Sequence, residues 1–242
     1  MERDVGRGSG LRIEVFADGA DLEGILELAA DPMVSGFTTN PTLMRKAGIE
    51  DYEGFARKVL DHVRDRPISF EVCADNFEEM RRQALRLSSW GQNVYVKIPV
   101  TNTEGISSGP LIADLTADGL RLNITGILTL AQVRTVAESL SASPGAVVSV
   151  FAGRIADTGR DPVPLMAAAV ELLRPYPPLK LLWASPREVL NVCQAESIGC
   201  DIITVTHDLL KKLGGLGRSL EEVSLDTVKM FYRDAVHAGY LL

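Results

Sequence analysis

The segment NVYVKIPV, residues 93–100, has the pattern of a buried β-strand with a charge inside it. Aliphatic side chains, which suit a pleated and buried surface, occupy alternate positions in it: Val94, Val96, Ile98 and Val100. Lys97 lies among them, and a lysine is almost never fully buried unless another group pairs with it or uses it. We therefore expect a buried strand whose lysine has either a structural partner or a chemical use.

Seven further apolar, β-branched runs occur along the chain at similar intervals. They are LRIEVF (11–16), VSGFTT (34–39), ISFEVC (68–73), RLNITGIL (121–128), AVVSVFAG (146–153), KLLWAS (180–185) and DIITVT (201–206). Near-continuous apolar strands that alternate with helices are typical of a parallel sheet covered by helices. Eight such units in 242 residues predict an α/β protein with a single (β/α)8 TIM barrel.

The segments between these runs have helical spacing. They cover residues 22–30, 49–63, 76–90, 129–142, 161–173, 185–199 and 206–213, and the connection 101–119 has the weakest helical pattern. Asn76 is expected to cap the third of these helices. Residues 219–242 predict an extra C-terminal helix, with Ser219 and Glu222 at capping-box spacing. We assign residues 1–10 to a flexible tail and residues 11–242 to one domain, the barrel with this helix.

A doubly wound sheet is the alternative architecture for the same alternation. Such a sheet usually carries a glycine-rich phosphate turn after its first strand. Here ADGADL (17–22) follows that strand and contains no GxGxxG, and no GxxxxGK[ST] occurs in the sequence. GRGSG (6–10) precedes the strand and is assigned to the tail. The barrel is therefore favoured.

The composition excludes several classes of function. With a net charge of −7, the chain is not expected to bind nucleic acid or an anionic membrane, although a few arginines in a pocket would suffice for small anions. No apolar run is long enough for a transmembrane helix, and MERDVGRGSG (1–10) has no signal region, so we expect a cytoplasmic protein. Cys73, Cys193 and Cys200 lack CxxC spacing and are interpreted as reduced core residues.

Polar residues gather where the expected strands end, which is where barrel enzymes place their catalytic groups. The candidates are Asp18, Thr38 to Asn40, Glu71, Lys97, Asn123, Thr125, Ser149 to Arg154, Ser185 to Arg187 and Thr204 to His207. Each alone has a structural explanation, and Lys97 with Glu71 could be a buried ion pair. Together at one barrel mouth they are hard to explain as packing. His207 is interpreted as the first residue of a helix.

Lys97 could serve such a site in two ways, as a phosphate-binding charge or as a neutral amine that attacks a carbonyl. Attack requires the amine to lose its proton, and burial in an apolar wall disfavours the charged form. A protonated imine then draws electrons from a neighbouring C–C bond and lets it break. The flanking Val96 and Ile98 suit this second use.

Several ordered motifs resemble the transaldolase family over most of the barrel. GFTTNPTLM (36–44) is similar to its TTNP signature, VKIPVTNTEG (96–105) to its Schiff-base segment, and SVFAGRIADTG (149–159) to its sixth-strand motif. ASPREV (184–189) and GCDIITV (199–205) fall where its seventh and eighth units should lie. A chance TTNP would be weak by itself, but the ordered set is specific. The resemblance implies a short-chain class I transaldolase.

The resemblance implies four catalytic roles. Lys97 would be the Schiff-base nucleophile, and Asp18 would take the proton of the C4 hydroxyl as the C3–C4 bond breaks. Glu71 and Thr125 would hold a water that moves protons while the carbinolamine becomes an imine. Neither a metal nor another cofactor is expected, since no His, Asp and Glu spacing suggests a metal site.

The resemblance also implies a set of substrate contacts. Asn40 and Ser149 would bind hydroxyls of the three-carbon unit, with Thr38 supporting Asn40, and two arginines would clamp phosphate in a bidentate manner. The full set is Thr38, Asn40, Ser149, Phe151, Arg154, Ser185 and Arg187. The expected partners are small sugar phosphates. The reaction would be transfer of a dihydroxyacetone unit from a ketose phosphate to an aldose phosphate, within the pentose phosphate pathway or a specialised biosynthesis.

Two alternative functions remain. A fructose-6-phosphate aldolase of the same superfamily releases free dihydroxyacetone, and two positions bear on the choice. That relative looks to carry Gln where this chain has Glu71 and Tyr where it has Phe151. Phe151 cannot donate a proton, which favours transfer. A non-catalytic sugar-phosphate-binding barrel could dispense with Lys97, Asp18 or Glu71, yet all three are present.

Some positions differ from the family pattern and leave the sugar chain length open. Trp183 stands where a smaller residue is usual, and we expect it to fill the barrel interior. Pro186 replaces an aromatic residue and could move Arg187. The resemblance also implies a homo-oligomer, in which the apolar residues 231–242 reach a neighbour; the alternative is that they fold back on their own barrel.

Overall fold

Eight parallel strands close into a barrel in chain order in the computed structural model, which describes residues 10–240. The strands are β1 (Glu14–Asp18), β2 (Val34–Thr38), β3 (Ile68–Glu71), β4 (Val94–Pro99), β5 (Leu122–Ile127), β6 (Ala146–Val150), β7 (Leu179–Trp183) and β8 (Ile202–Thr206). β1 pairs with β8 as well as β2, which closes the sheet. The (β/α)8 fold predicted from the sequence is confirmed, and the expected tail lies almost wholly outside the described residues.

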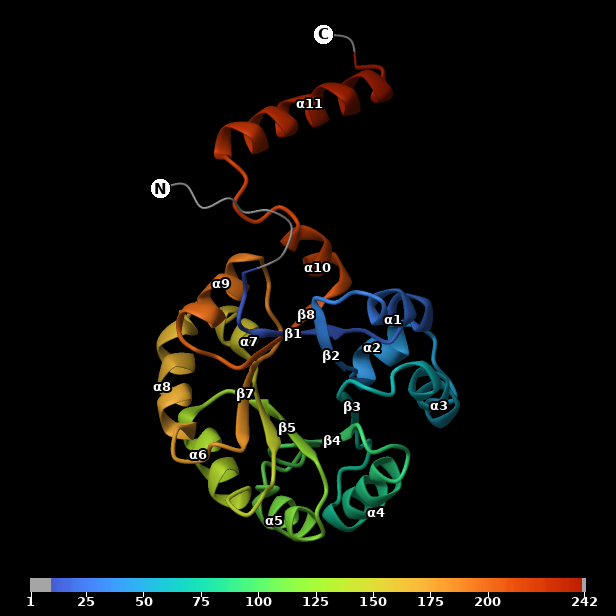
Figure 1. Ribbon diagram of the computed structural model, residues 1–242, viewed down its shortest axis with the longest axis vertical. Helices are drawn as coiled ribbons and strands as arrows, with labels where there is room; N and C mark the ends of the chain where they lie inside the picture. Colours follow the sequence, from blue (N-terminus) through green and yellow to red (C-terminus); the bar gives the residue numbers. More distant parts are fainter. Residues whose placement is uncertain (1–9, 241–242) are drawn as a thin grey trace.

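Helices surround the strands, except for the last helix, which projects away from the barrel (Figure 1). They are α1 (Leu22–Ala29), α2 (Pro41–Lys46), α3 (Tyr52–His62), α4 (Phe77–Ser88), α5 (Gly109–Ala117), α6 (Leu130–Ser139), α7 (Ala152–Ala156), α8 (Val163–Leu173), α9 (Leu190–Ser197), α10 (His207–Leu213) and α11 (Leu220–Ala238). Asn76 caps α4 as predicted, and His207 begins α10. No described helix is both long enough and apolar enough to cross a membrane.

Two short helices were not predicted. α2 follows β2, and α7 follows β6, where the sequence suggested that the strand would continue to residue 153. The strand ends earlier because Phe151 turns the chain: its backbone N–H bonds the carbonyl of Ile127, and its own carbonyl accepts the first helical bonds of α7. Both short helices therefore stand at the carboxyl ends of the strands.

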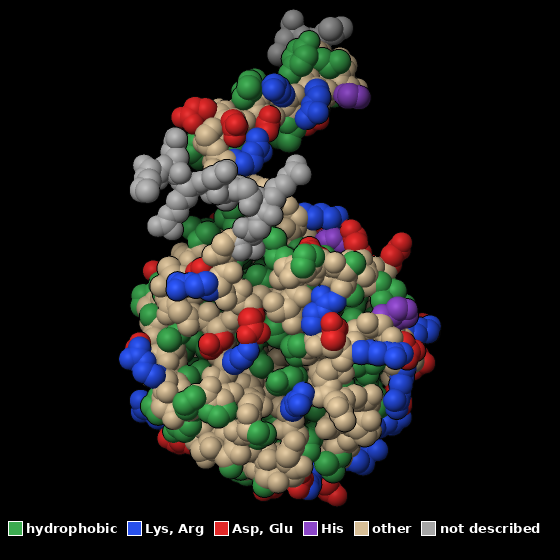
Figure 2. All heavy atoms as spheres, in the orientation of Figure 1, with side chains coloured by type: hydrophobic (Ala, Val, Ile, Leu, Met, Phe, Trp, Pro, Cys, Tyr) green, Lys and Arg blue, Asp and Glu red, His purple; other side chains and the backbone are tan. Residues whose placement is uncertain are grey.

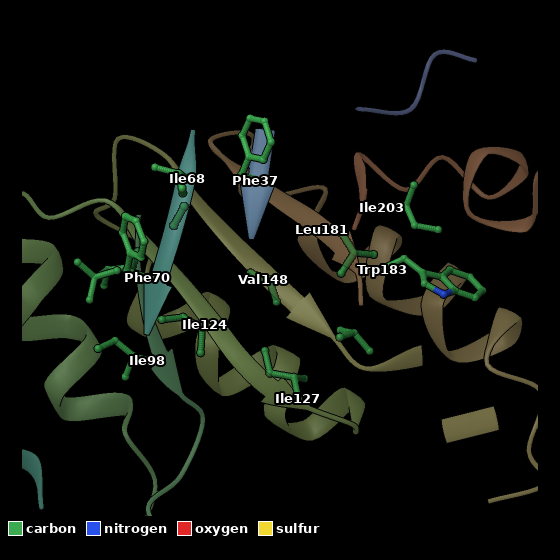
Figure 3. Packing of buried hydrophobic residues seen from close by; sticks show 14 of the residues in the cluster. Phe37, Ile68, Phe70, Ile98, Ile124, Ile127, Val148, Leu181, Trp183 and Ile203 are labelled. Atoms are coloured by element: carbon green, nitrogen blue, oxygen red, sulfur yellow. The ribbon is translucent and has the colours of Figure 1, made fainter. Parts of the chain in front are cut away.

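The strands bury apolar residues on their outer face, against the helices. Outward residues such as Phe37, Phe70, Ile98 and Ile124 are fully enclosed and belong to one continuous core (Figure 3). A second, smaller cluster fills the inside of the barrel with Phe16, Val147, Leu182, Ala184 and Ile202. Gly36 makes room for it, since a Cβ there would lie 2.6 Å from the ring of Phe16.

Trp183 does not fill the barrel interior as predicted. It belongs to the outer core with Leu181 and Ile203, and is fully buried between the sheet and its helices (Figure 3). The reason is the two-residue alternation of β7, in which Leu182 and Ala184 face inward and Trp183 outward. Its indole nitrogen has no hydrogen-bond partner among the described residues.

The C-terminal helix α11 stands away from the barrel (Figure 1). None of its residues is buried, and its apolar side chains lie on the surface between charged ones (Figure 2). Ser219 caps it through the backbone N–H of Glu222.

The interpretation of the cysteines as buried core residues was wrong in part. Cys200 is buried, but Cys73 and Cys193 are exposed, and all three are free thiols.

Candidate active site

A cavity of about 480 Å³ opens at the carboxyl ends of the strands. Every residue to which the resemblance gives a catalytic or substrate-binding role lines it, while the candidates Thr39, Asn123 and His207 do not. The lining residues with such a role are Asp18, Thr38, Asn40, Glu71, Lys97, Thr125, Ser149, Phe151, Arg154, Ser185 and Arg187. They come from the six strands β1 to β6 and from the segments that follow β2, β6 and β7. The alternation along each strand explains this gathering, because residues two apart share the inner face.

Lys97 lies on the inner face of β4, with Val96 and Ile98 on the outer face. Only 6% of the residue is exposed. Its Nζ donates a hydrogen bond to the backbone carbonyl of Thr39 at 2.9 Å and lies 3.5 Å from Glu71 Oε2. The parallel register places Glu71 directly beside Lys97. The amine therefore has one carboxylate neighbour and faces the cavity.

Two carboxylates share this cavity, and burial raises the pKa of each. The pKa of Asp18 is raised by burial, and the charge of Lys97 and hydrogen bonds from Thr38 and Asn40 oppose that rise. The pKa of Glu71 is also raised by burial, against the charge of Lys97. Each carboxyl group is thus closer to exchanging a proton near neutral pH than a solvent-exposed one would be.

The position of Glu71 is fixed by its backbone. The Tyr52 hydroxyl donates to the Glu71 carbonyl and accepts from the Glu71 N–H, both at 2.9 Å.

On β5, the Thr125 hydroxyl is buried and has no hydrogen-bond partner among the described residues. A buried hydroxyl without a partner is costly, so a water or ligand in the cavity would be a favourable partner for it.

Two amide side chains, Asn40 and Asn123, make hydrogen bonds at and behind the cavity lining. Asn40 caps α2 by accepting from the backbone N–H of Leu43 at 2.9 Å, while its NH₂ group lies toward Asp18 and helps to lower the pKa of that carboxyl group. Ser149 donates to Asn123 at 2.6 Å, and Asn123 donates to Ser69 at 3.0 Å. This buried network orients Ser149. The Thr38 hydroxyl, expected to support Asn40, instead bonds Asp18 and Thr204.

The two arginines differ in their contacts. Arg154 on α7 lies over the ring of Phe151, with its guanidinium carbon 5.4 Å from the ring centre. Arg187 forms a two-point ion pair with Asp157, in which Nε donates to Oδ1 at 3.1 Å. Both guanidinium groups are exposed at the rim of the cavity. Arg154 is the freer of the two for a bound anion.

The loops that carry these arginines are locked together. Gly153 packs against the carbonyl of Ser185, and an added Cβ would lie 1.5 Å from that oxygen, so only glycine fits. Ser185 has a φ of 62° and is the only non-glycine residue with a positive φ in the described range 10–240. Such a conformation is strained and often found at functional sites. Pro186 is buried and lines the cavity beside it.

Several cavity residues were not among the predicted site residues. They are Pro41, Thr42, Leu43, Lys46, Leu182 and Ala184. Lys46 has no readable signal in the sequence, because its position depends on the unpredicted helix α2. Pro186, Thr204 and Thr206 also line the cavity, and they were among the candidates expected at the strand ends. Within residues 10–240, no group of three His, Cys, Asp or Glu side chains is placed to hold a metal ion.

Solved structures share the fold of this chain. A 3-hexulose-6-phosphate synthase superposes with a TM-score of 0.58 at 15% identity, covering 81% of this chain and 90% of that one. A dihydrodipicolinate synthase from Rhodopseudomonas palustris gives 0.55 at 16% identity, covering 80% and 69%. At these identities the likeness shows the barrel fold alone.

Sequence relatives are closer. A probable transaldolase of Dehalococcoides mccartyi is 34% identical over 203 residues, which cover 83% of this chain and 90% of the relative. A probable transaldolase of Methanococcus vannielii is 32% identical over 216 residues, covering 88% and 94%. The model of the family described as Transaldolase/Fructose-6-phosphate aldolase matches residues 15–240. The chain therefore belongs to the transaldolase/fructose-6-phosphate aldolase family.

Proposed function

We propose that this protein is a transaldolase that transfers a dihydroxyacetone unit between sugar phosphates through a Schiff base on Lys97. The observation that carries the proposal is the placement of a buried lysine amine in the cavity, 3.5 Å from the Glu71 carboxylate, with a second carboxylate, Asp18, lining the same cavity. An ion pair that served only packing would need one carboxylate and no cavity. The two carboxylates with pKa values raised by burial supply the proton transfers.

The first half of the reaction is imine formation. The neutral amine of Lys97 attacks the C2 carbonyl of a ketose phosphate and forms a carbinolamine, whose hydroxyl must leave as water. Glu71 lies next to Nζ and is placed to take the ammonium proton and return it to the departing hydroxyl. The unpartnered hydroxyl of Thr125 would hold the water involved.

The second half is carbon–carbon cleavage. Asp18 removes the proton of the C4 hydroxyl, the C3–C4 electron pair moves toward the imine nitrogen, and C4 leaves as the aldehyde of an aldose phosphate. The remaining enamine on Lys97 then attacks the aldehyde of a second aldose phosphate. Asn40 and Ser149 line the cavity between these groups and would bind the hydroxyls of the three-carbon unit.

Phosphate recognition is assigned to the rim. Arg154 and Arg187, with Ser185 from the same loop as Arg187, would bind the phosphate at the far end of donor and acceptor. Phe151 offers the enamine no proton, which favours transfer over release of free dihydroxyacetone. The proposed setting is cytoplasmic sugar-phosphate metabolism, either in the pentose phosphate pathway or in a biosynthesis that uses a longer ketose.

Transfer and release can be distinguished directly. The protein is incubated with fructose 6-phosphate alone and with fructose 6-phosphate plus erythrose 4-phosphate, and the products are measured by mass spectrometry. The proposal expects seven-carbon ketose phosphate with the acceptor and little free dihydroxyacetone without it. Rapid release of dihydroxyacetone without acceptor would favour the aldolase. Neither product, with a range of ketose phosphates, would favour a binding barrel.

We also propose that the protein forms a homo-oligomer through α11. The helix exposes large apolar side chains, including Phe231 at 63% and Val236 at 61%, and buries none of its residues within its own chain. Light scattering of the whole chain and of a chain ending at Arg218 tests this. We expect an assembly for the former and a smaller particle for the latter. A monomeric whole chain would contradict it.

A further inference from the structure

Three side chains from three adjacent strands form a short hydrogen-bonded chain at the barrel mouth. Thr38 Oγ1 on β2 lies 2.8 Å from Asp18 Oδ1 on β1 and 2.5 Å from Thr204 Oγ1 on β8. Thr38 and Thr204 are 4% and 5% exposed. Little water can compete for their hydroxyl groups. The two hydrogen bonds depend on each other because they share the Thr38 hydroxyl.

The direction of these bonds follows from counting hydrogens. Each threonine hydroxyl has one hydrogen, and an ionised carboxylate can only accept. The Thr38 hydrogen therefore points to Asp18. The Thr204 hydrogen must then point to Thr38, because two facing lone pairs at 2.5 Å would repel each other. Over the part of the chain that the structure describes, no other hydrogen-bond partner competes for the Thr204 hydroxyl.

We propose that Thr204 is a positioning residue that acts on Asp18 through Thr38. Its hydroxyl fixes the Thr38 hydrogen on Oδ1 of Asp18, so that Oδ2 is the oxygen that receives the proton of the substrate. The inference rests on the proposed function, in which Asp18 gains the C4 hydroxyl proton while the C3–C4 electron pair moves to the imine nitrogen of Lys97. Hydrogen bonds in series strengthen one another, so the Thr204 bond also makes Thr38 a stronger donor.

Asp18 needs this support because some neighbouring groups raise its pKa and others lower it. The other charged or titratable groups around it are Lys97 on β4, Glu71 on β3 and, at the rim and in the adjoining cavity, Lys46, Arg154, Arg187, Asp21, His207 and Asp208. Burial raises the pKa of Asp18, and the Thr38 hydrogen bond lowers it. Loss of the Thr204 hydroxyl weakens that bond, so Asp18 should ionise at higher pH.

The variant that tests this is Thr204→Val, which keeps the shape of threonine and removes the hydroxyl, with Thr204→Ser as the matched control. We expect the acidic limb of the pH profile of kcat/KM to move to higher pH in the valine variant. Below that limb the activity should fall about two- to tenfold, and above it approach that of the unchanged protein. The serine variant should restore the profile. An equal loss at every pH, or the same loss with serine, would assign Thr204 a packing role and overturn the proposal.

A second measurement does not depend on activity. The unfolding equilibrium constant is measured at pH 7 for Thr204→Val, Asp18→Asn and the double variant, which form a double-mutant cycle. We expect a coupling of about two- to tenfold between the two positions. Absence of coupling would overturn the role of Thr204 even if Lys97 forms an adduct with substrate. Coupling without any adduct would support Thr204 as the residue that orients Asp18 and would refute the Schiff-base function separately.

Discussion

The inner and outer faces of the barrel strands are built from neighbouring residues with opposite properties. On β4, Lys97 faces the cavity, while Ile98, the next residue, is fully enclosed by the helices. On β1, Asp18 faces inward and Ala17 outward. The inner face at the barrel mouth holds ionisable and hydroxyl side chains, and the outer face holds aliphatic and aromatic ones. Residues that serve the site and residues that stabilise the fold therefore alternate along each strand.

This separation has a physical basis. The outer face gains free energy from apolar burial, at about 25 cal/mol per Å². At the barrel mouth, the inner face loses part of this free energy. Burial raises the pKa of Asp18 and Glu71 there, and the Thr125 hydroxyl has no hydrogen-bond partner among the described residues. We therefore expect changes on the inner face to alter activity more than stability, and changes on the outer face to do the reverse.

The largest effect on activity is expected from Lys97→Met. Methionine fills a similar volume but cannot form an imine, so transfer activity should fall more than about 10⁴-fold. The protein should remain folded, since the loss of a charge next to Glu71 is partly offset by an apolar side chain. Circular dichroism measures whether the variant is folded, and a coupled assay measures its transfer activity. Activity above about one per cent of the original would contradict the role of Lys97.

Its outer-face counterpart is Ile98→Ala. Removing three buried carbons from a fully enclosed site should lower the free energy of unfolding by about 2–5 kcal/mol. The fraction of protein that stays folded should keep its kcat, because Ile98 does not line the cavity. Urea unfolding gives the stability and active-site titration gives the folded fraction. A large drop in kcat at unchanged stability would break the separation of the two faces.

Asp18→Asn sharpens the comparison because it should affect the two properties in opposite directions. Loss of the base should lower activity about 10²- to 10⁴-fold. The raised pKa of Asp18 means that the folded state holds this proton more tightly than the unfolded state. Its contribution to stability is present below the ordinary pKa of aspartate, and it is lost as pH rises through the folded-state pKa.

The ionised Asp18 side chain thus opposes folding at neutral pH, and asparagine removes that cost. The variant should be more stable than the original protein at pH 7, and the difference should shrink as the pH falls toward about 4. Urea unfolding at both pH values measures it. A less stable variant at pH 7 would show that the pairing of Asp18 with Lys97 outweighs its burial.

The smallest effect is expected at the rim, with Asp157→Asn. Asp157 holds Arg187 in an exposed ion pair and competes with an incoming phosphate for it. Removing that competition should lower KM for a sugar phosphate a few-fold, with little change in stability, since exposed pairs contribute about 0–1 kcal/mol. Steady-state kinetics with matched phosphorylated and unphosphorylated donors provide the measurement. A raised KM would mean that Asp157 positions Arg187 for phosphate instead.

Much of this arrangement could be predicted from the sequence because a strand alternates strictly between two faces. Lys97 was recognisable as an inward residue since its neighbours are aliphatic, and the same pattern brought Asp18 and Glu71 to one cavity. Trp183 was placed on the wrong face because β7 is apolar on both sides, which removes the signal of alternation. The barrel fold, in contrast, was predicted from eight alternating strand and helix patterns, so an error at one residue did not affect it.

Features that depend on short or irregular elements could not be predicted. α2 and α7 have six and five residues, too few for a helical pattern, so Lys46 was missed at the cavity. The ion pair of Arg187 depends on where α7 places Asp157. The bond from Thr38 to Asp18, instead of Asn40, depends on the register between β1 and β2. These contacts join strands and short helices whose relative positions are set only when the barrel closes.

The central claim, a Schiff base on Lys97, is tested most directly by trapping it. The protein is incubated with fructose 6-phosphate or sedoheptulose 7-phosphate, reduced with borohydride, digested and analysed by mass spectrometry, with Lys97→Met and Lys46→Met as paired variants. The account predicts a reduced three-carbon adduct on Lys97 that persists in the Lys46 variant and disappears in the Lys97 variant. An adduct on another lysine, or none on folded protein with either donor, would contradict it.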